Sequence, residues 1–225
     1  MRSAAAGGPG ADPDDLTTRA RIRDAAVVRF GREGFGASLR TVAADAGVSP
    51  GLVIHHFASK DGLRRACDEY VLRVTREAKR RSIVTGGPGG LVAELAAIEE
   101  YAPVAAYLAQ ALLGGGELAR TLLDQAIANA EAYLAEGVEA GRLRPSRDPA
   151  ARARFLAYAG AGAFLLYVRQ HAPPDGDLSA VLTAYAAEMT VPALELYTEG
   201  LLSDSSLLDA VLARTEADAG GTNPT

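Results

Sequence analysis

Apolar residues recur along most of this chain at spacings of three and four residues, which is the period of a helix with one buried face. Two early series are Ile22, Ala25, Ala26 and Phe30, followed by Leu39, Val42, Ala43 and Ala46. No alternating pattern of the kind that predicts a strand persists. Breaks at glycine and proline separate the helical segments, so the pattern predicts an all-α fold of roughly nine or ten helices.

Both ends of the chain lack this period. Residues 1–15 are rich in glycine, proline and aspartate, and residues 218–225 are rich in glycine with a late proline. Such segments bury little apolar surface, so we expect two disordered tails. The part between them is long enough to bury a substantial core.

The signals that start and stop helices are densest in the first third of the chain. Ser38 is suited to cap a short helix that ends before Gly47, and Gly47 is suited to a left-handed turn. Ser49 and Pro50 are an N-cap followed by proline at the first helical position. Two short helices joined by a turn containing glycine predict a helix-turn-helix, whose second helix enters the major groove of DNA.

The second helix of this motif is expected over about residues 50–57, and its two faces differ. Three apolar residues on this helix or just before it are expected to face the protein interior: Val48, Val53 and Phe57. Four residues of the helix are expected to face outward: Gly51, Leu52, His55 and His56. Lys60 follows at the start of the next helix, where its charge suits a phosphate.

Charge is distributed unevenly between two regions. The whole chain has a formal net charge of -5. Residues 16–81 carry 14 Lys and Arg against 7 Asp and Glu, whereas residues 82–225 carry 8 against 18. A basic first third attached to an acidic remainder suggests a nucleic-acid contact confined to the first third.

The chain resembles the TetR family of bacterial transcriptional regulators over about residues 17–65. The residues at family spacing are Thr18, Arg19, Ile22, Ala25, Ala26, Phe30, Gly34, Phe35, Ser38, Val42, Ala43, Ala46, Gly47, Val48, Ser49, Gly51, His56, Phe57, Lys60 and Leu63. The resemblance implies a three-helix DNA-binding domain over residues 16–65 and a larger helical bundle over residues 66–217. It further implies a homodimeric repressor that binds a double-stranded DNA operator and an unidentified small-molecule effector. A cytoplasmic location is expected because Cys67 is the single cysteine and the first residues lack an apolar signal segment.

The resemblance also implies which residues contact DNA. They are Ser38, Arg40, Thr41, Ser49, Pro50, Gly51, Leu52, His55, His56 and Lys60. The chain departs from the family at one place. The family usually has a tyrosine there, often paired with another aromatic residue, and this chain has Ile54 and His55. The phosphate-binding hydroxyl of that tyrosine is missing.

Two late segments are candidates for the dimer interface. A helix expected to begin after Asp148 and to reach about His171 presents one small and apolar face, formed by Phe155, Ala159, Ala163 and Leu166. A following helix from Asp177 is expected to bend at Pro192. These two helices either pair with those of a second subunit, the usual arrangement in the family, or pack within one subunit.

The effector site is predicted from polar residues in the second domain. Gln125, Asn129 and Tyr133 follow one another at spacings of four on one helix, and such a strip suits the wall of a pocket. The other candidates are Tyr101, Tyr107, Gln110, Tyr158 and Tyr167. The alternative is that the two amides are solvated and the tyrosines belong to the core.

Other function classes are less well supported. A helical ligand-binding or structural protein without an operator is the main alternative. His55 and His56 lie about 100° apart on a helix and cannot face one metal ion, so neither a metal site nor a cofactor is expected. Cys67 is more simply a structural cysteine than a reactive one.

The chain also lacks a segment expected to cross a membrane. The longest apolar run, from Phe155 to Val168, has 14 residues, which is short of the roughly 20 needed to cross a membrane.

Overall fold

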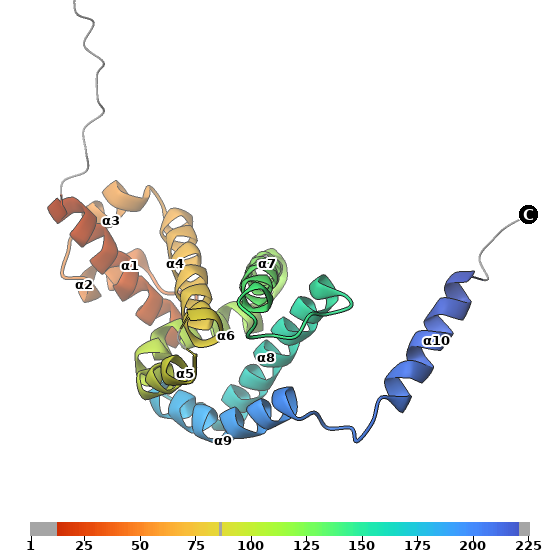
Figure 1. Cartoon of the computed structure of the whole chain (residues 1–225). Coiled ribbons are helices and arrows are strands. Elements are labelled where there is room, and N and C mark those ends of the chain that lie inside the picture. Colours follow the sequence, from red (N-terminus) through yellow and green to blue (C-terminus); the bar gives the residue numbers. More distant parts are fainter. Residues whose placement is uncertain (1–12, 86, 221–225) are drawn as a thin grey trace, which may run out of the picture. The chain divides into compact units, whose positions relative to one another are not determined.

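The computed structural model describes residues 13–85 and 87–220, and the regular elements in that part of the chain are helical (Figure 1). The α-helices are α1 (Pro13–Glu33), α2 (Leu39–Asp45), α3 (Pro50–Phe57), α4 (Lys60–Arg80), α5 (Gly87–Ala96), α6 (Ala102–Gly114), α7 (Gly116–Glu139), α8 (Pro149–His171), α9 (Ser179–Thr198) and α10 (Ser206–Gly220). A short π-helix, η1 (Arg81–Thr85), continues α4, and a 3₁₀ turn, η2 (Ile98–Tyr101), precedes α6. The all-α prediction is confirmed.

The outer helices extend into the segments predicted to be tails. Helix α1 begins at Pro13, inside the predicted tail of residues 1–15. Proline suits the first turn of a helix because the N–H it lacks would have no partner there, so Pro13 marks a helix start rather than a loop. Helix α10 likewise continues to Gly220. Residues 1–12 and 221–225 lie outside the described residues.

The largest core joins α1 to α4 and includes part of α6. Its buried members are Ile22, Ala26, Val27, Phe30, Val42, Ala43, Ala46, Val53, Phe57, Leu63, Cys67, Val71, Val104 and Tyr107. Helix α1 approaches α6 closely at Gly31, where an added Cβ would lie 3.0 Å from the backbone nitrogen of Tyr107. The predicted boundary near residue 65 is therefore crossed by a continuous core.

Cys67 lies in this core and has no exposed surface. Burial is the main reason that the pKa of its thiol is raised, to about 12. A thiol with this pKa is protonated at neutral pH and is a poor nucleophile. The structure therefore favours the structural interpretation of Cys67.

Smaller cores join α6, α7, α8 and the start of α9 within the first compact unit, which ends at Tyr185. Tyr167 and Val168 of α8 pack with Val181 of α9 and with alanines of α6. Another small core joins α7 to α8. The second unit, Ala186–Thr225, contains the end of α9 and α10. No helix among the described residues combines the length and apolar character needed to cross a membrane.

Candidate nucleic-acid interface

The two short helices of the predicted motif are capped by the serines expected from the sequence. The Oγ of Ser38 accepts a hydrogen bond from the backbone N–H of Thr41 at 3.1 Å. The Oγ of Ser49 accepts one from the N–H of Leu52 at 3.2 Å. Gly47, in the turn between the helices, has φ 64°, the left-handed conformation that glycine adopts without strain. The predicted helix-turn-helix is confirmed.

Helix α3 has one face in the core and one toward solvent. Val53 is fully buried and Phe57 nearly so, while Val48 packs on the same core from the turn. Gly51 and His55 are exposed, and Leu52 and His56 are half-buried. The predicted division is observed for the inward residues and for Gly51 and His55, whereas Leu52 is half-buried and His56 turns its Nε2 away from solvent.

Ile54 is a further exposed residue on α3, with 45% of its surface accessible. Sequence reasoning named it only as a departure from the family and did not place it on the outer face. The sequence carries no clear signal for its exposure, because Ile54 is as apolar as its buried neighbour Val53. The outer face of α3 thus carries an unusual exposed aliphatic side chain.

Two glycines near α3 have different structural roles. A Cβ added to Gly62, in the first turn of α4, would overlap the carbonyl oxygen of Phe57 at the end of α3. A Cβ added to Gly51 would meet only the Oγ of Ser49 at 3.9 Å, an ordinary contact. Gly62 is therefore required by the packing of α3 on α4, whereas the small size of Gly51 leaves room for something outside the chain.

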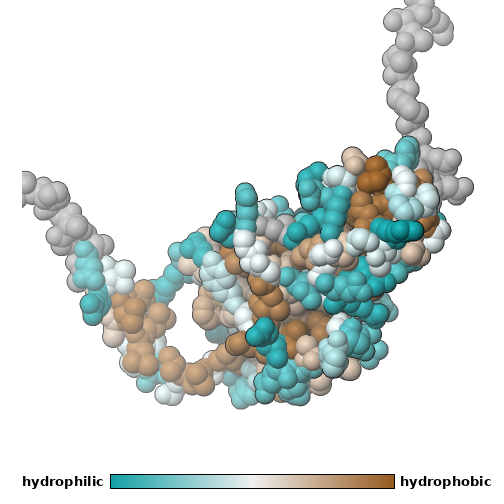
Figure 2. Space-filling view, turned by 180° about the vertical axis from the view of Figure 1, so that it is seen from behind, coloured by the Kyte–Doolittle hydropathy of each residue, from teal (hydrophilic) through white to brown (hydrophobic). Residues whose placement is uncertain are grey.

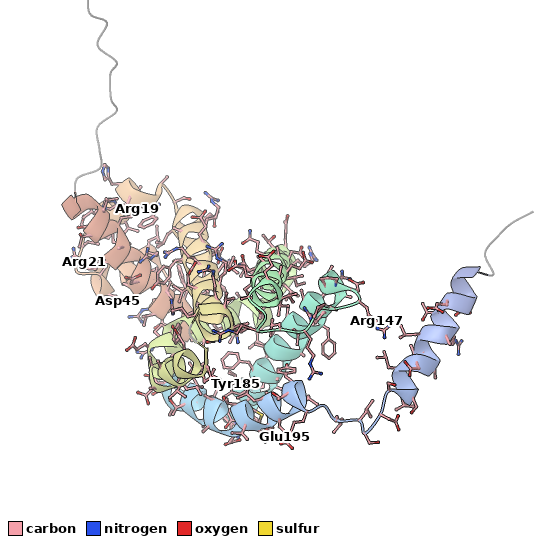
Figure 3. All side chains as sticks on the ribbon, viewed as in Figure 1. Arg19, Arg21, Asp45, Arg147, Tyr185 and Glu195 are labelled. Carbon is pink, nitrogen blue, oxygen red and sulfur yellow. The ribbon has the colours of Figure 1, made fainter. Side chains whose placement is uncertain are left out.

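Basic side chains surround the motif. The Nζ of Lys60 donates a hydrogen bond to the carbonyl of Gly36 at 3.1 Å, which ties the start of α4 to the loop before α2. Arg40 on α2 is exposed and forms no ion pair within the described part of the chain. Arg19 on α1 lies over the ring of Phe57 at 4.9 Å, and Figure 3 shows it near α3. Arg19 was not among the predicted contacts.

Arg29 fixes α2 against α1. Its guanidinium makes two hydrogen bonds to the carboxylate of Asp45 at the end of α2, of 2.6 Å and 2.7 Å. These bonds hold the pKa of Asp45 below its ordinary value. The pair is partly exposed, so we expect it to contribute about 1 kcal/mol or less while setting the orientation of α2.

A buried hydrogen bond joins α4 to α6. The hydroxyl of Tyr107 donates to Oδ1 of Asp68 at 2.5 Å, and both side chains are buried. Burial raises the pKa of Asp68, and the hydrogen bond from Tyr107 acts in the opposite direction. Phe35 packs edge-on against Tyr107, with ring centroids 5.1 Å apart.

The predicted effector residues do not converge on one site. Tyr107 belongs to the core just described, and Tyr167 is buried and stacked on His171 at 4.1 Å. Tyr101 donates a hydrogen bond to Glu94 at 2.5 Å and accepts one from Arg81 at 2.8 Å. Tyr107 and Tyr167 thus lie in cores, whereas Tyr101 is half-buried and bonded to side chains of α5 and η1.

The other predicted residues are divided among separate places. Gln125 and Asn129 line an open cleft of 260 Å³ between α4 and α7. Tyr133, the third residue of the predicted strip, packs on the core between α7 and α8 instead. Gln110 is half-buried beside the turn at Gly34.

A second open cleft, of 370 Å³, involves α6, α7 and α8. Its lining is Leu112, Gly115, Gly116, Ala119, Arg120, Leu123, Tyr158, Ala161, Gly162 and Leu165. Among the predicted residues Tyr158 alone contributes to it. Arg120, which was not predicted, is the cation of this lining, and its apolar neighbours are characteristic of a small-molecule site.

Known proteins resemble the chain in both halves. Residues 22–67 match the family described as "Bacterial regulatory proteins, tetR family", and residues 99–203 match "Tetracyclin repressor-like, C-terminal domain". The HTH-type transcriptional regulatory protein RaaS of Mycobacterium tuberculosis is 53% identical over 202 residues, which cover 90% of this chain and 95% of RaaS.

Solved structures share the fold. FadR of Bacillus subtilis, solved in complex with stearoyl-CoA, has a TM-score of 0.57 at 18% identity, over 81% of this chain and 99% of FadR. A tetR-family regulator of Streptomyces coelicolor has a TM-score of 0.54 at 18% identity, over 91% of this chain and 98% of its own. At these identities the likeness is one of fold.

Proposed function

The chain belongs to the TetR family and is an HTH-type transcriptional regulator rather than an enzyme, and from that premise we propose that it acts as a homodimeric repressor controlled by a small molecule. The family assignment sets aside the alternative of a helical protein without an operator. The observation that carries the DNA-binding part is the outer face of α3, where Gly51 is small without a packing reason. Each α3 of the dimer would enter one major groove.

The basic residues around the motif would bind DNA phosphates. Arg40 lies on α2 and Lys60 at the start of α4, directly after α3, and the N-terminus of α3 would add its helix dipole. Replacement of Arg40 by alanine should weaken binding to all duplexes about equally and reduce the dependence on log salt by about one unit.

A salt titration on operator and random duplex tests these phosphate contacts. Arg169→Ala is the matched control, because this exposed arginine lies on α8. Lys60→Ala should have a smaller effect than Arg40→Ala, since Lys60 already donates to the backbone of Gly36. Equal slopes for Arg40→Ala and the parent protein would contradict this role.

The dimer would use the small and apolar face of α8. Phe155 and Leu166 leave 67% and 73% of their surfaces accessible in the single chain, and Ala159 and Ala163 between them are exposed. Such a face suits a self-complementary contact around a twofold axis. Leu166→Asp should yield monomers in sedimentation velocity, whereas Ala132→Asp at an exposed position of α7 should not.

The effector would occupy the 370 Å³ cleft of α6, α7 and α8. Its apolar walls suit the body of a small molecule, and Arg120 with Tyr158 suits one anionic or hydrogen-bond accepting group. Anilinonaphthalene sulfonate has both features and is a usable probe. Its fluorescence should titrate with the parent protein and weaken for Arg120→Ala, but not for Arg169→Ala. Equal titrations for all three would exclude this cleft.

A further inference from the structure

The segment from Glu199 to Asp218, named the arm here, has an apolar surface that its own compact unit does not cover. Among the side chains described between residues 186 and 218, none is buried. Figure 2 shows this part of the chain as a largely apolar surface. Its large exposed side chains are Leu201 at 84%, Leu202 at 58%, Leu207 at 63%, Leu208 at 49% and Val211 at 63%.

The helix of the arm, α10, nevertheless has side-chain hydrogen bonds at its N-terminal end. The carboxylate of Asp204 accepts a hydrogen bond from the backbone N–H of Ser206 at 2.9 Å, and the Oγ of Ser205 donates to Asp209 at 2.7 Å. An isolated helix of 15 residues with an uncovered apolar face is marginal in water. The arm therefore requires an apolar surface from elsewhere.

The arm is also acidic. It carries the carboxylates Glu199, Asp204, Asp209, Glu216 and Asp218 against the single cation Arg214. Its partner surface should therefore combine apolar and basic side chains.

One surface of the chain has this combination. The connection between α7 and α8 and the first turns of α8 present four exposed arginines, Arg142, Arg144, Arg147 and Arg154. None of the four forms an ion pair within the described part of the chain. Phe155 follows them directly, with 67% of its surface accessible. Residues 142–155 are named the basic shoulder here.

We propose that the arm of one subunit packs on the basic shoulder of a second copy of this chain. Each surface is exposed within its own compact unit, and a second copy supplies the complement of each at once. Phe155 belongs both to the shoulder and to the proposed dimer face of α8, so the two contacts would be continuous. A helix of 15 residues is about 22 Å long, enough to cross several turns of a neighbouring helix.

This inference rests on the proposed homodimer, which it extends beyond α8 and α9. Residues after 203 lie outside the segment matched by the C-terminal family domain. Helix α10 therefore lies outside the matched segment, while the start of the arm, with Leu201 and Leu202, lies inside it. Packing of the arm would increase dimer affinity and make that affinity dependent on salt.

Cross-linking between two differently tagged full-length chains tests which copy the arm contacts. One chain carries Ala213→Cys on α10, at an exposed position outside the apolar face, and the other carries Arg147→Cys. The native Cys67 is fully buried and does not react. A short bismaleimide should join the two chains, whereas Ala213→Cys with Glu131→Cys on α7 should give little product. Cross-links formed solely within one chain that carries both cysteines would overturn the proposal.

Dimer affinity of the full chain gives the second readout. Leu208→Asp with Val211→Asp should raise the dimer dissociation constant about tenfold, equal to about 1.4 kcal/mol, and should reduce its salt dependence. Ala213→Asp is the control on the same helix. Unchanged affinity with an intact dimer would refute the arm contact alone, while a monomeric parent protein would refute the homodimer as well.

The shoulder arginines have a competing partner in DNA phosphates. Arg147→Glu with Arg154→Glu should weaken the dimer and leave the salt slope of operator binding per dimer unchanged. If the pair instead lowers that slope while dimer affinity stays the same, the shoulder binds DNA and the proposal is wrong.

Discussion

The region from α1 to α4 and the region from α5 to α10 differ in how completely they bury their large apolar side chains. In the first, Ile22, Val42, Val53 and Leu63 have no exposed surface and belong to one core. In the second, the cores are small and large side chains such as Leu166 remain 73% exposed. This difference fits the proposed functions, because a region that presents one fixed geometry to DNA would pack on itself, and a region that binds an effector or a second copy would leave apolar surface for it.

Two glycines of the first region differ in the same way from two glycines of α8. Gly31 and Gly62 lie in the first region or at its border with α6, and an added Cβ would meet neighbouring atoms at both. Gly160 and Gly162 on α8 have no neighbour within 4 Å of an added Cβ. In the first region glycine allows close packing within the chain, and on α8 it leaves a shallow surface open to a second molecule.

Among the changes considered for the first region, Gly62→Ala should cause the largest loss of stability. The new Cβ would overlap the carbonyl oxygen of Phe57, so α3 and α4 must separate. We expect a loss of about 3 kcal/mol in the free energy of unfolding and loss of operator binding. Urea unfolding and a DNA titration measure the two effects. Gly89→Ala on α5, where the added Cβ has open space, should instead stabilise by up to about 1 kcal/mol.

Tyr107→Phe tests whether the two regions are joined by the buried hydrogen bond between α4 and α6. The change removes the hydroxyl and leaves the carboxylate of Asp68 buried with one partner fewer. We expect a loss of about 2 kcal/mol in unfolding free energy. Tyr158→Phe, at an exposed tyrosine of α8, is the control. A loss no larger than that of the control would show that the bond adds no net stability.

The same pair predicts a pH effect. Because burial raises the pKa of Asp68 in the folded state, the folded protein keeps a proton that the unfolded chain loses above about pH 4. The contribution of Asp68 to stability therefore decreases as pH rises from there through the raised pKa. Asp68→Asn should remove this pH dependence, so the stability of the variant relative to the parent protein should increase as pH rises above about 4. A constant difference above that pH would contradict the assignment.

The outer face of α3 should decide which bases are preferred. Leu52 suits a thymine methyl group and His55 suits a hydrogen-bond acceptor on a base edge. Leu52→Ala and His55→Ala should each cost about 1–3 kcal/mol of discrimination at one or two positions per half-site. Selection of binding sites from random duplexes measures this, with Arg169→Ala as control. Identical selected sites for all variants would show that another face of the motif contacts the bases.

The two regions also differ in how far their structure could be predicted. The caps at Ser38 and Ser49 and the turn at Gly47 are local signals, so the bounds of α2 and α3 followed from the sequence alone. The candidate effector residues were chosen by spacing along single helices. Whether Gln125 and Tyr133 share a cleft depends on which helix packs on which, and one sequence does not contain that information.

Arg120 shows the same limit, because it lines a cleft but was not predicted. A single arginine among alanines and leucines has the pattern of a solvated residue, and it becomes a candidate contact through the approach of α6 and α8 to α7. Gly62 was missed for a related reason. Its neighbour, the carbonyl of Phe57, comes from the preceding helix, and helix periodicity does not reveal such a contact between elements.

The smallest expected effect concerns the end of α3. Ala58 follows this helix with φ 62°, and the N–H of Ser59 donates to the carbonyl of Phe57 at 2.8 Å, which closes a tight γ-turn. An L-residue is strained in this conformation, and glycine is not. Ala58→Gly should therefore stabilise the fold by about 1 kcal/mol or less, since the greater freedom of glycine in the unfolded chain offsets part of the gain. Ala44→Gly, at an exposed position inside α2, should destabilise by a similar amount. If thermal unfolding shows both changes to be destabilising, the turn at Ala58 is not strained, and glycine at the end of α3 offers no gain in stability.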